Sequence, residues 1–358
     1  MKNLIPIIKR IAESITRTEN MRKKLANFLR DIEPEVKLVY KSTPGSLENI
    51  KIVGIDGGLI KKSLHGFDCI LTRAAGVCFC YKDSRIQSVK YFPSRFPTPI
   101  PEVFENLSDM DWNYTATISR QRTEIKTAVQ CIDRFEPDVL LLDGLAIPHY
   151  SDKPSKSSII YAGYKELIDN YKQLYEKARK RGILLAGVIE DSRSAAFCNL
   201  IKEDALSQVK GATTPLIELL DKTRDTNLLF LLLEKGERSK VFKYAKSSKE
   251  HPVLRDFDEY GEKIYSFYLK TAKWDRPIRI DFLSWSSETI QQTADKLASV
   301  LLAVSGQHSG YGLPTPLIEA DNVAKLSDNE MENFYSQILS LTGNTPSVMK
   351  LRREQRPF

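Results

Sequence analysis

The stretch VGIDGG, Val53 to Gly58, is an apolar run that ends in an aspartate followed at once by two glycines. Together with the residues before it, it predicts a buried β-strand, IKIVGID, over residues 50–56. A carboxylate at the end of a buried strand is poorly solvated, and glycines beside it let the backbone come close to a neighbour. Two interpretations are open: a tight turn, or a metal or phosphate site.

Acidic residues follow two other apolar strands. Asp143 ends VLLLD within the predicted strand DVLLLDG, residues 138–144, and is again followed by glycine, while Asp191 follows ILLAGVIE. Ligands of open α/β sheets bind at strand ends, and carboxylates gathered there repel one another unless a divalent cation is bound. A single aspartate after a strand is more often a turn residue or a helix cap. A metal site is favoured here because Asp56 and Asp143 share the same pattern.

The order of predicted elements indicates the fold class. Strands are predicted at 50–56, 68–81, 86–92, 138–144 and 183–191, and helices at 1–30, 114–134 and 159–181. This order predicts an α/β fold, a mixed sheet flanked by helices with an N-terminal helical extension. The expected division is an N-terminal arm (1–45), a main domain (46–340) and a C-terminal tail (341–358).

The bulk composition limits the functions to consider. The chain has 358 residues, a formal net charge of +7 and a pI of about 8.9, a mild basic excess that permits a nucleic-acid partner without requiring one. Its five cysteines form no CxxC pair, which is typical of reduced thiols in a cytosolic protein. No apolar run approaches the ~18 residues of a membrane span. We therefore expect a cytoplasmic protein with no membrane partner.

Several motifs in one order resemble the NurA nuclease family: VGIDGG, SRQRTEIKTA, VLLLDG, AGVIEDSRS and GLPTPLIEADNVAKL, over about residues 50–330. This resemblance implies an RNase H-like core, a homodimer, and cleavage of DNA with Mn²⁺ or Mg²⁺. It also implies a HerA-type hexameric ATPase as partner, in DNA end processing or anti-phage defence.

The resemblance assigns the metal ligands residue by residue. Asp56 matches the first-strand aspartate, Glu124 the helix glutamate and Asp143 the later aspartate, while Asp321 stands where the family often has a histidine. That departure keeps a metal-capable side chain but changes its charge. In two-metal hydrolysis Asp56 would bridge both ions, Asp143 and Glu124 would complete one, and Asp321 the other.

Basic residues near these motifs are the candidates for DNA contact. Where the family often has a lysine this chain has Glu190 or Asp191, so support of the phosphate is expected from Arg193 instead. Phosphate contacts of this kind give salt-sensitive binding without sequence preference. The predicted set is Lys61, Lys62, Arg73, Arg120, Arg122 and Arg193. Phe92, Phe96 and Phe104 either stack on bases or pack in the core.

Two alternatives stay open. Actin-like ATPases and sugar kinases share the RNase H-like core, and GIDGG and LLLDGL resemble their phosphate loops, but the sequence has no second Gly-rich loop and no Walker motif. The other alternative is a catalytically silent subunit that docks on a translocase, for which the departure at Asp321 leaves room.

Overall fold

The computed structural model describes residues 4–32, 36–105, 107–205, 214–343 and 345–352. The chain forms two compact units. Unit 1 comprises Met1–Ser46, Val188–Tyr244 and Tyr265–Pro314, and unit 2 comprises Leu47–Gly187, Ala245–Ile264 and Thr315–Phe358. The chain passes from unit 2 into unit 1 within β7 (Leu184–Ile189).

Unit 1 combines helices with a small sheet. Its helices are α1 (Ile5–Asp31), α5 (Ala196–Leu200), a π-helix (Ile201–Ala205), α6 (Thr214–Asp221), α7 (Asp225–Leu232) and α8 (Ile290–Val304). Its strands are β1 (Val39–Lys41), β8 (Glu237–Ser239), β10 (Ile264–Leu269) and β11 (Ile278–Leu283) in that order, with β9 (Phe242–Lys243) paired to β10. The C-terminal half of α1 buries Leu25 and Leu29 in a core shared with α7.

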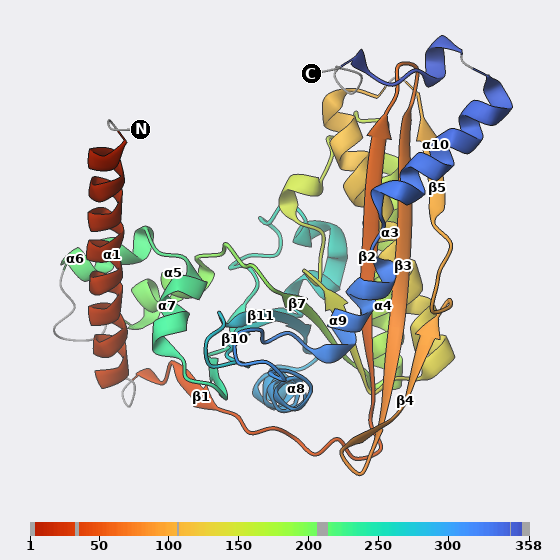
Figure 1. The fold of residues 1–358 in the computed structure, drawn as a ribbon. Helices are drawn as coiled ribbons and strands as arrows, with labels where there is room; N and C mark the ends of the chain where they lie inside the picture. Colours follow the sequence, from red (N-terminus) through yellow and green to blue (C-terminus); the bar gives the residue numbers. More distant parts are fainter. Residues whose placement is uncertain (1–3, 33–35, 106, 206–213, 344, 353–358) are drawn as a thin grey trace. The chain divides into compact units, whose positions relative to one another are not determined.

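Unit 2 contains the long sheet, with the strand order β7-β6-β2-β3-β4 (Figure 1). Its strands are β2 (Lys51–Ser63), β3 (Asp68–Lys82), β4 (Arg85–Phe92), β5 (Ile100–Phe104, paired to β3), β6 (Val139–Asp143) and the first part of β7. β2 pairs antiparallel with β3 and parallel with β6, so the sheet is mixed.

Helices cover both faces of this sheet. Figure 1 shows α9 (Thr315–Ala324) and α10 (Asp328–Thr342) in front of β2 and β3, with α3 (Asp109–Phe135) and α4 (Tyr161–Arg181) behind them. The glycines of β2 show which helix covers each face of the strand. A Cβ on Gly54 would lie 2.3 Å from the Pro316 carbonyl oxygen of α9. A Cβ on Gly57 would instead lie 3.1 Å from Glu124 Oε2 of α3. Neighbouring residues of a strand point to opposite faces, so β2 lies between the two helices.

The prediction that β2 ends at Asp56 is wrong. β2 continues to Ser63, and neither Gly57 nor Gly58 has a positive φ, so VGIDGG is the middle of a long strand and not a turn. The glycines make room for the protein's own helices, because a Cβ on Gly58 would lie 2.0 Å from the Ala324 carbonyl oxygen. Gly144, after Asp143, does have a positive φ of 105° and forms a turn.

The other fold predictions are largely confirmed. The predicted strands at 68–81 and 86–92 are β3 and β4, and the predicted helices at 114–134 and 159–181 are α3 and α4. All five cysteines are free thiols. Within the described residues, no helix is both long and apolar enough to cross a bilayer. The division into arm, main domain and tail stays a prediction, and residues 344 and 353–358 of the tail lie outside the described residues.

The close packing of α9 on β2 can be tested with Gly58→Ala. The new methyl group would overlap the Ala324 backbone, so α9 or β2 must shift. We expect a loss of stability of about 1–3 kcal/mol, the usual cost of overpacking, measured by urea unfolding.

Gly163→Ala is the matched control. A Cβ there meets only Arg122 Nη1 at 3.6 Å and Ile118 Cγ2 at 3.7 Å, which are ordinary contacts, and Gly163 lies in α4. Because alanine favours a helix over glycine, this change should leave stability equal or slightly higher. Equal unfolding midpoints for both variants would contradict the close contact at Gly58.

Candidate active site

The parallel pairing of β2 and β6 brings two of the predicted acids together. Ile55 lies opposite Leu142, so the next residues, Asp56 and Asp143, stand side by side on strands about 4.8 Å apart. The Asp56 carboxyl also makes a hydrogen bond with the Asp143 carboxyl. Two carboxyl groups this close share protons readily, because both cannot ionise without repulsion.

Asp321 joins this pair from α9. Asp56 is 5% exposed, and it accepts a hydrogen bond of 2.6 Å from the backbone N–H of Gly57. Burial raises the pKa of Asp56, the Gly57 N–H and the Arg120 guanidinium oppose this, and the charge of Asp321 raises that pKa further. β6 and α9 therefore place two further carboxyl groups, those of Asp143 and Asp321, close to that of Asp56 on β2.

Glu124 approaches β2 from the opposite face. Asp56 lies on the same side of the strand as Gly54 and Gly58, which face α9, whereas Gly57 faces Glu124. Glu124 therefore reaches β2 from the side opposite α9, yet the charges of Asp56 and Asp143 still act on it, and its place among the metal ligands stays a prediction. Glu124 is 4% exposed, and burial raises its pKa to about 8; Arg120 opposes this shift, and the charges of Asp56 and Asp143 add to it.

Arg120 is the cation among these acids. Its Nη1 donates hydrogen bonds to Glu124 Oε2 at 3.2 Å and to the Gly57 carbonyl at 3.3 Å. Sequence reasoning assigned this arginine to DNA and missed the ion pair. The signal was present, since residues four apart on a helix are neighbours and Arg120 precedes Glu124 by four.

The donor set fits a hard divalent cation. Among the residues that the structure describes, no group of three or more His, Cys, Asp or Glu is already arranged around a common ion position. The carboxyl groups of Asp143 and Asp321 nevertheless both act on that of Asp56, and burial disfavours the ionised form of Asp56. Carboxylate oxygen is the ligand that Mg²⁺ and Mn²⁺ prefer, and a bound cation would offset this cost.

The remaining basic residues mostly pair with acids of unit 2. Lys62 pairs with Glu332, Arg73 with Glu330 and Arg122 with Glu166. Lys61 donates to Asn113 Oδ1 at 2.9 Å and is exposed, and Arg193 is exposed in unit 1. Their part in DNA binding stays a prediction.

The raised pKa of Glu124 gives a test by Glu124→Gln. A carboxyl whose folded pKa lies above its ordinary 4.5 contributes stability that is full below pH 4.5 and is lost as the pH rises through about 8. Glutamine does not ionise. In EDTA, the variant should therefore gain Tm relative to the native chain between pH 5 and pH 9, by about 2–4 °C for each kcal/mol.

Glu166→Gln is the control for this measurement. Hydrogen bonding to Lys126 lowers the pKa of Glu166, so its removal should give no gain in Tm as the pH rises. A Tm difference between Glu124→Gln and the native chain that stays constant with pH would contradict the assignment.

Comparisons with known proteins agree with this arrangement of elements. A family model described as the NurA domain matches residues 50–326. The crystal structure of the NurA nuclease from Sulfolobus solfataricus is 17% identical, with a TM-score of 0.56, over 93% of this chain and 96% of that one. A NurA crystal structure with manganese is 10% identical, with a TM-score of 0.58, over 95% of this chain and 99% of that one. A search of curated proteins found no match.

These similarities confirm the predicted mixed sheet flanked by helices, with an N-terminal helix. The family model covers well over half of the sequence, and the elements that carry the acidic residues Asp56, Glu124, Asp143 and Asp321 all lie within it. The chain belongs to the NurA family of nucleases.

Proposed function

We propose that this protein is a DNA nuclease that hydrolyses phosphodiester bonds with Mn²⁺ or Mg²⁺. The observation that carries the proposal is the meeting of Asp56, Asp143 and Asp321 on the α9 side of the sheet, in a partly buried place. Membership in the NurA family and the manganese in a NurA crystal structure support it.

In this proposal a different contact within the fold positions each carboxylate. Asp56 is oriented by the Gly57 N–H, Asp143 by the parallel pairing of β6 with β2, and Asp321 by the close packing of α9 on β2. When bound, the metal would supply a water of lowered pKa and neutralise charge on the phosphate. Asp56, Asp143 and Asp321 would hold it.

Glu124 is the fourth proposed acid, acting from the α3 side. Burial raises its pKa to about 8, so positive charge added beside Asp56 would favour its ionised form. Arg120 fixes its carboxyl against the Gly57 carbonyl, which keeps Glu124 close to the backbone of β2.

The wider biological role extends the proposal through the family resemblance. We propose a homodimer that works with a HerA-type hexameric ATPase, in end processing or anti-phage defence. The preference for exonuclease or endonuclease cleavage can be measured by comparing the cleavage of linear and circular DNA in the presence of Mn²⁺. Tight ATP binding by the isolated protein with no cleavage of DNA would favour the ATPase alternative instead.

The first test is Asp56→Asn, measured by cleavage of a labelled DNA with Mn²⁺. The amide keeps the size of the side chain and removes its charge. We expect a loss of at least about 100-fold, because outer-shell partners of metal ligands already contribute 10–100-fold.

Asp83→Asn is its control, since Asp83 is exposed in the turn between β3 and β4 at a positive φ, where asparagine is tolerated. Equal rates for Asp56→Asn and the native chain would contradict the proposal.

The second test compares Asp321→His with Asp321→Ala. Histidine can bind a divalent cation and alanine cannot, so the histidine variant should retain measurable cleavage and the alanine variant should fall to background. Thermal unfolding checks that both are folded. Complete loss in a folded Asp321→His variant would show that the two side chains are not equivalent here.

A further inference from the structure

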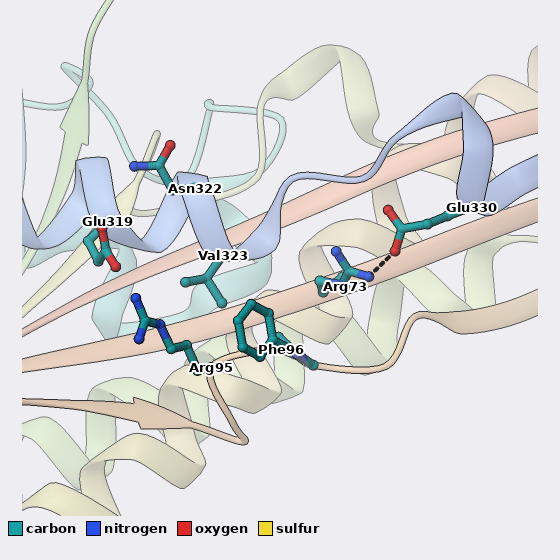
Figure 2. Close-up of a pocket in the computed structure, with 8 residues that line it drawn as sticks. Arg73, Arg95, Phe96, Glu319, Asn322, Val323 and Glu330 are labelled. Carbon is teal, nitrogen blue, oxygen red and sulfur yellow. Dashed lines mark hydrogen bonds and ion pairs between the residues drawn. The ribbon is translucent and has the colours of Figure 1, made fainter.

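A pocket of about 430 Å³ lies beside α9 in unit 2 (Figure 2). It is formed by β3, the loop that follows β4, α9 and the start of α10. Its lining residues are Arg73, Arg95, Phe96, Pro97, Glu319, Asn322, Val323 and Glu330. The loop is therefore held against the helix that also carries Asp321, although none of the four proposed metal ligands lines the pocket.

Phe96 is an unusual feature of this pocket. Its side chain is 86% exposed, although burying a phenylalanine would stabilise a fold by about 1.5–3 kcal/mol. Figure 2 shows its ring directed at Val323, with Arg95 beside it pointing toward Glu319. The Arg95 guanidinium lies 5.9 Å from the centre of the Phe96 ring and 5.7 Å from that of Tyr91. An open aromatic face and a cation are thus presented together.

The charges of the pocket leave Arg95 available. Glu319 accepts a hydrogen bond of 2.8 Å from the Tyr91 hydroxyl, and Glu330 pairs with Arg73. Within the described part of the chain, Arg95 has no carboxylate at ion-pair distance. An arginine beside an open ring is the combination that binds a nucleotide of a single strand, the ring stacking on the base and the cation contacting the phosphate.

We propose that this pocket is a subsite for one nucleotide of single-stranded DNA, with the base on Phe96 and the phosphate on Arg95. The proposal rests on the proposed nuclease function and names the form of its substrate. A base within a duplex is stacked on its neighbours and cannot offer its face to Phe96.

The geometry of α9 sets the distance from the acids. Glu319 and Val323 are each two residues from Asp321, about 200° around the helix, so the pocket and Asp321 occupy opposite flanks. A strand that joins them crosses α9, which is about 10–12 Å thick with side chains.

Binding is measured apart from cleavage, by fluorescence anisotropy of a labelled 12-nucleotide single strand in EDTA. The expected result is a roughly tenfold weaker Kd for Phe96→Ala, recovered in Phe96→Trp. Arg95→Ala should weaken binding and lower the slope of log K against log salt by about 0.7. Ile86→Ala and Arg85→Ala on exposed β4 positions are the matched controls and should bind as the native chain does.

A second readout reports stacking itself. 2-Aminopurine is placed within the strand, and its fluorescence should be quenched by the native chain and by Phe96→Trp, but not by Phe96→Ala. Unchanged affinity and quenching in Phe96→Ala would overturn the subsite. So would a Phe96→Ala variant whose sedimentation changes while its DNA affinity does not, because Phe96 would then contact protein.

The two proposals fail in different ways. If the native chain cleaves DNA and Phe96→Ala binds and cleaves equally well, the subsite is wrong and the nuclease stands. If the native chain cleaves nothing but shows the Phe96-dependent quenching, the subsite stands and the proposed nuclease function is wrong.

Discussion

The backbone of α9 rests directly on the backbone of β2, and the rest of the site depends on this contact. It is possible only because positions 54 and 58 are glycine, since a Cβ at either would overlap Pro316 or Ala324. With α9 so close, Asp321 acts on the charge of Asp56. The pocket with Phe96 follows from the same contact, because α9 forms one of its walls.

The charge arrangement separates the two faces of β2. On the α9 side, Asp143 and Asp321 both lie close to Asp56 and the charge of Asp321 raises its pKa, and on the α3 side Glu124 accepts a hydrogen bond from Arg120. Only one strand lies between them, and the charges of Asp56 and Asp143 add to the raised pKa of Glu124. A gain of positive charge on the α9 side should therefore be felt on the α3 side without any movement of the backbone.

Much of the fold could be predicted from the sequence, because most helices and strands are determined by residues that are close together in the chain. The apolar runs of β3 and β6 and the helical periodicity of α3 and α4 depend on residues close in the chain. The contact between β2 and α9 does not, since it joins residues near 55 to residues near 320. VGIDGG was therefore interpreted as the end of a strand. Two of its glycines, Gly54 and Gly58, instead leave space for the backbone of α9, which lies far along the chain.

The site was predicted unevenly for the same reason. Asp56 and Asp143 are adjacent because two strands pair in register, which a pattern of strand-ending acids can suggest. The face from which Glu124 approaches depends on the path of α3 over the sheet, and the partners of Lys62 and Arg73 come from α10. Such distant partners leave no mark on the local sequence around each residue.

The packing of α9 on β2 also determines when the acidic site is completed during synthesis of the chain. Asp56 and Asp143 are synthesised early, but Asp321 follows Asp143 by 178 residues and reaches them only when α9 has folded onto Gly54 and Gly58. If the protein is a nuclease as proposed, an unfinished or truncated chain lacks one of its acids. The chain would then be unable to cleave DNA until α9 has been synthesised and has folded onto β2.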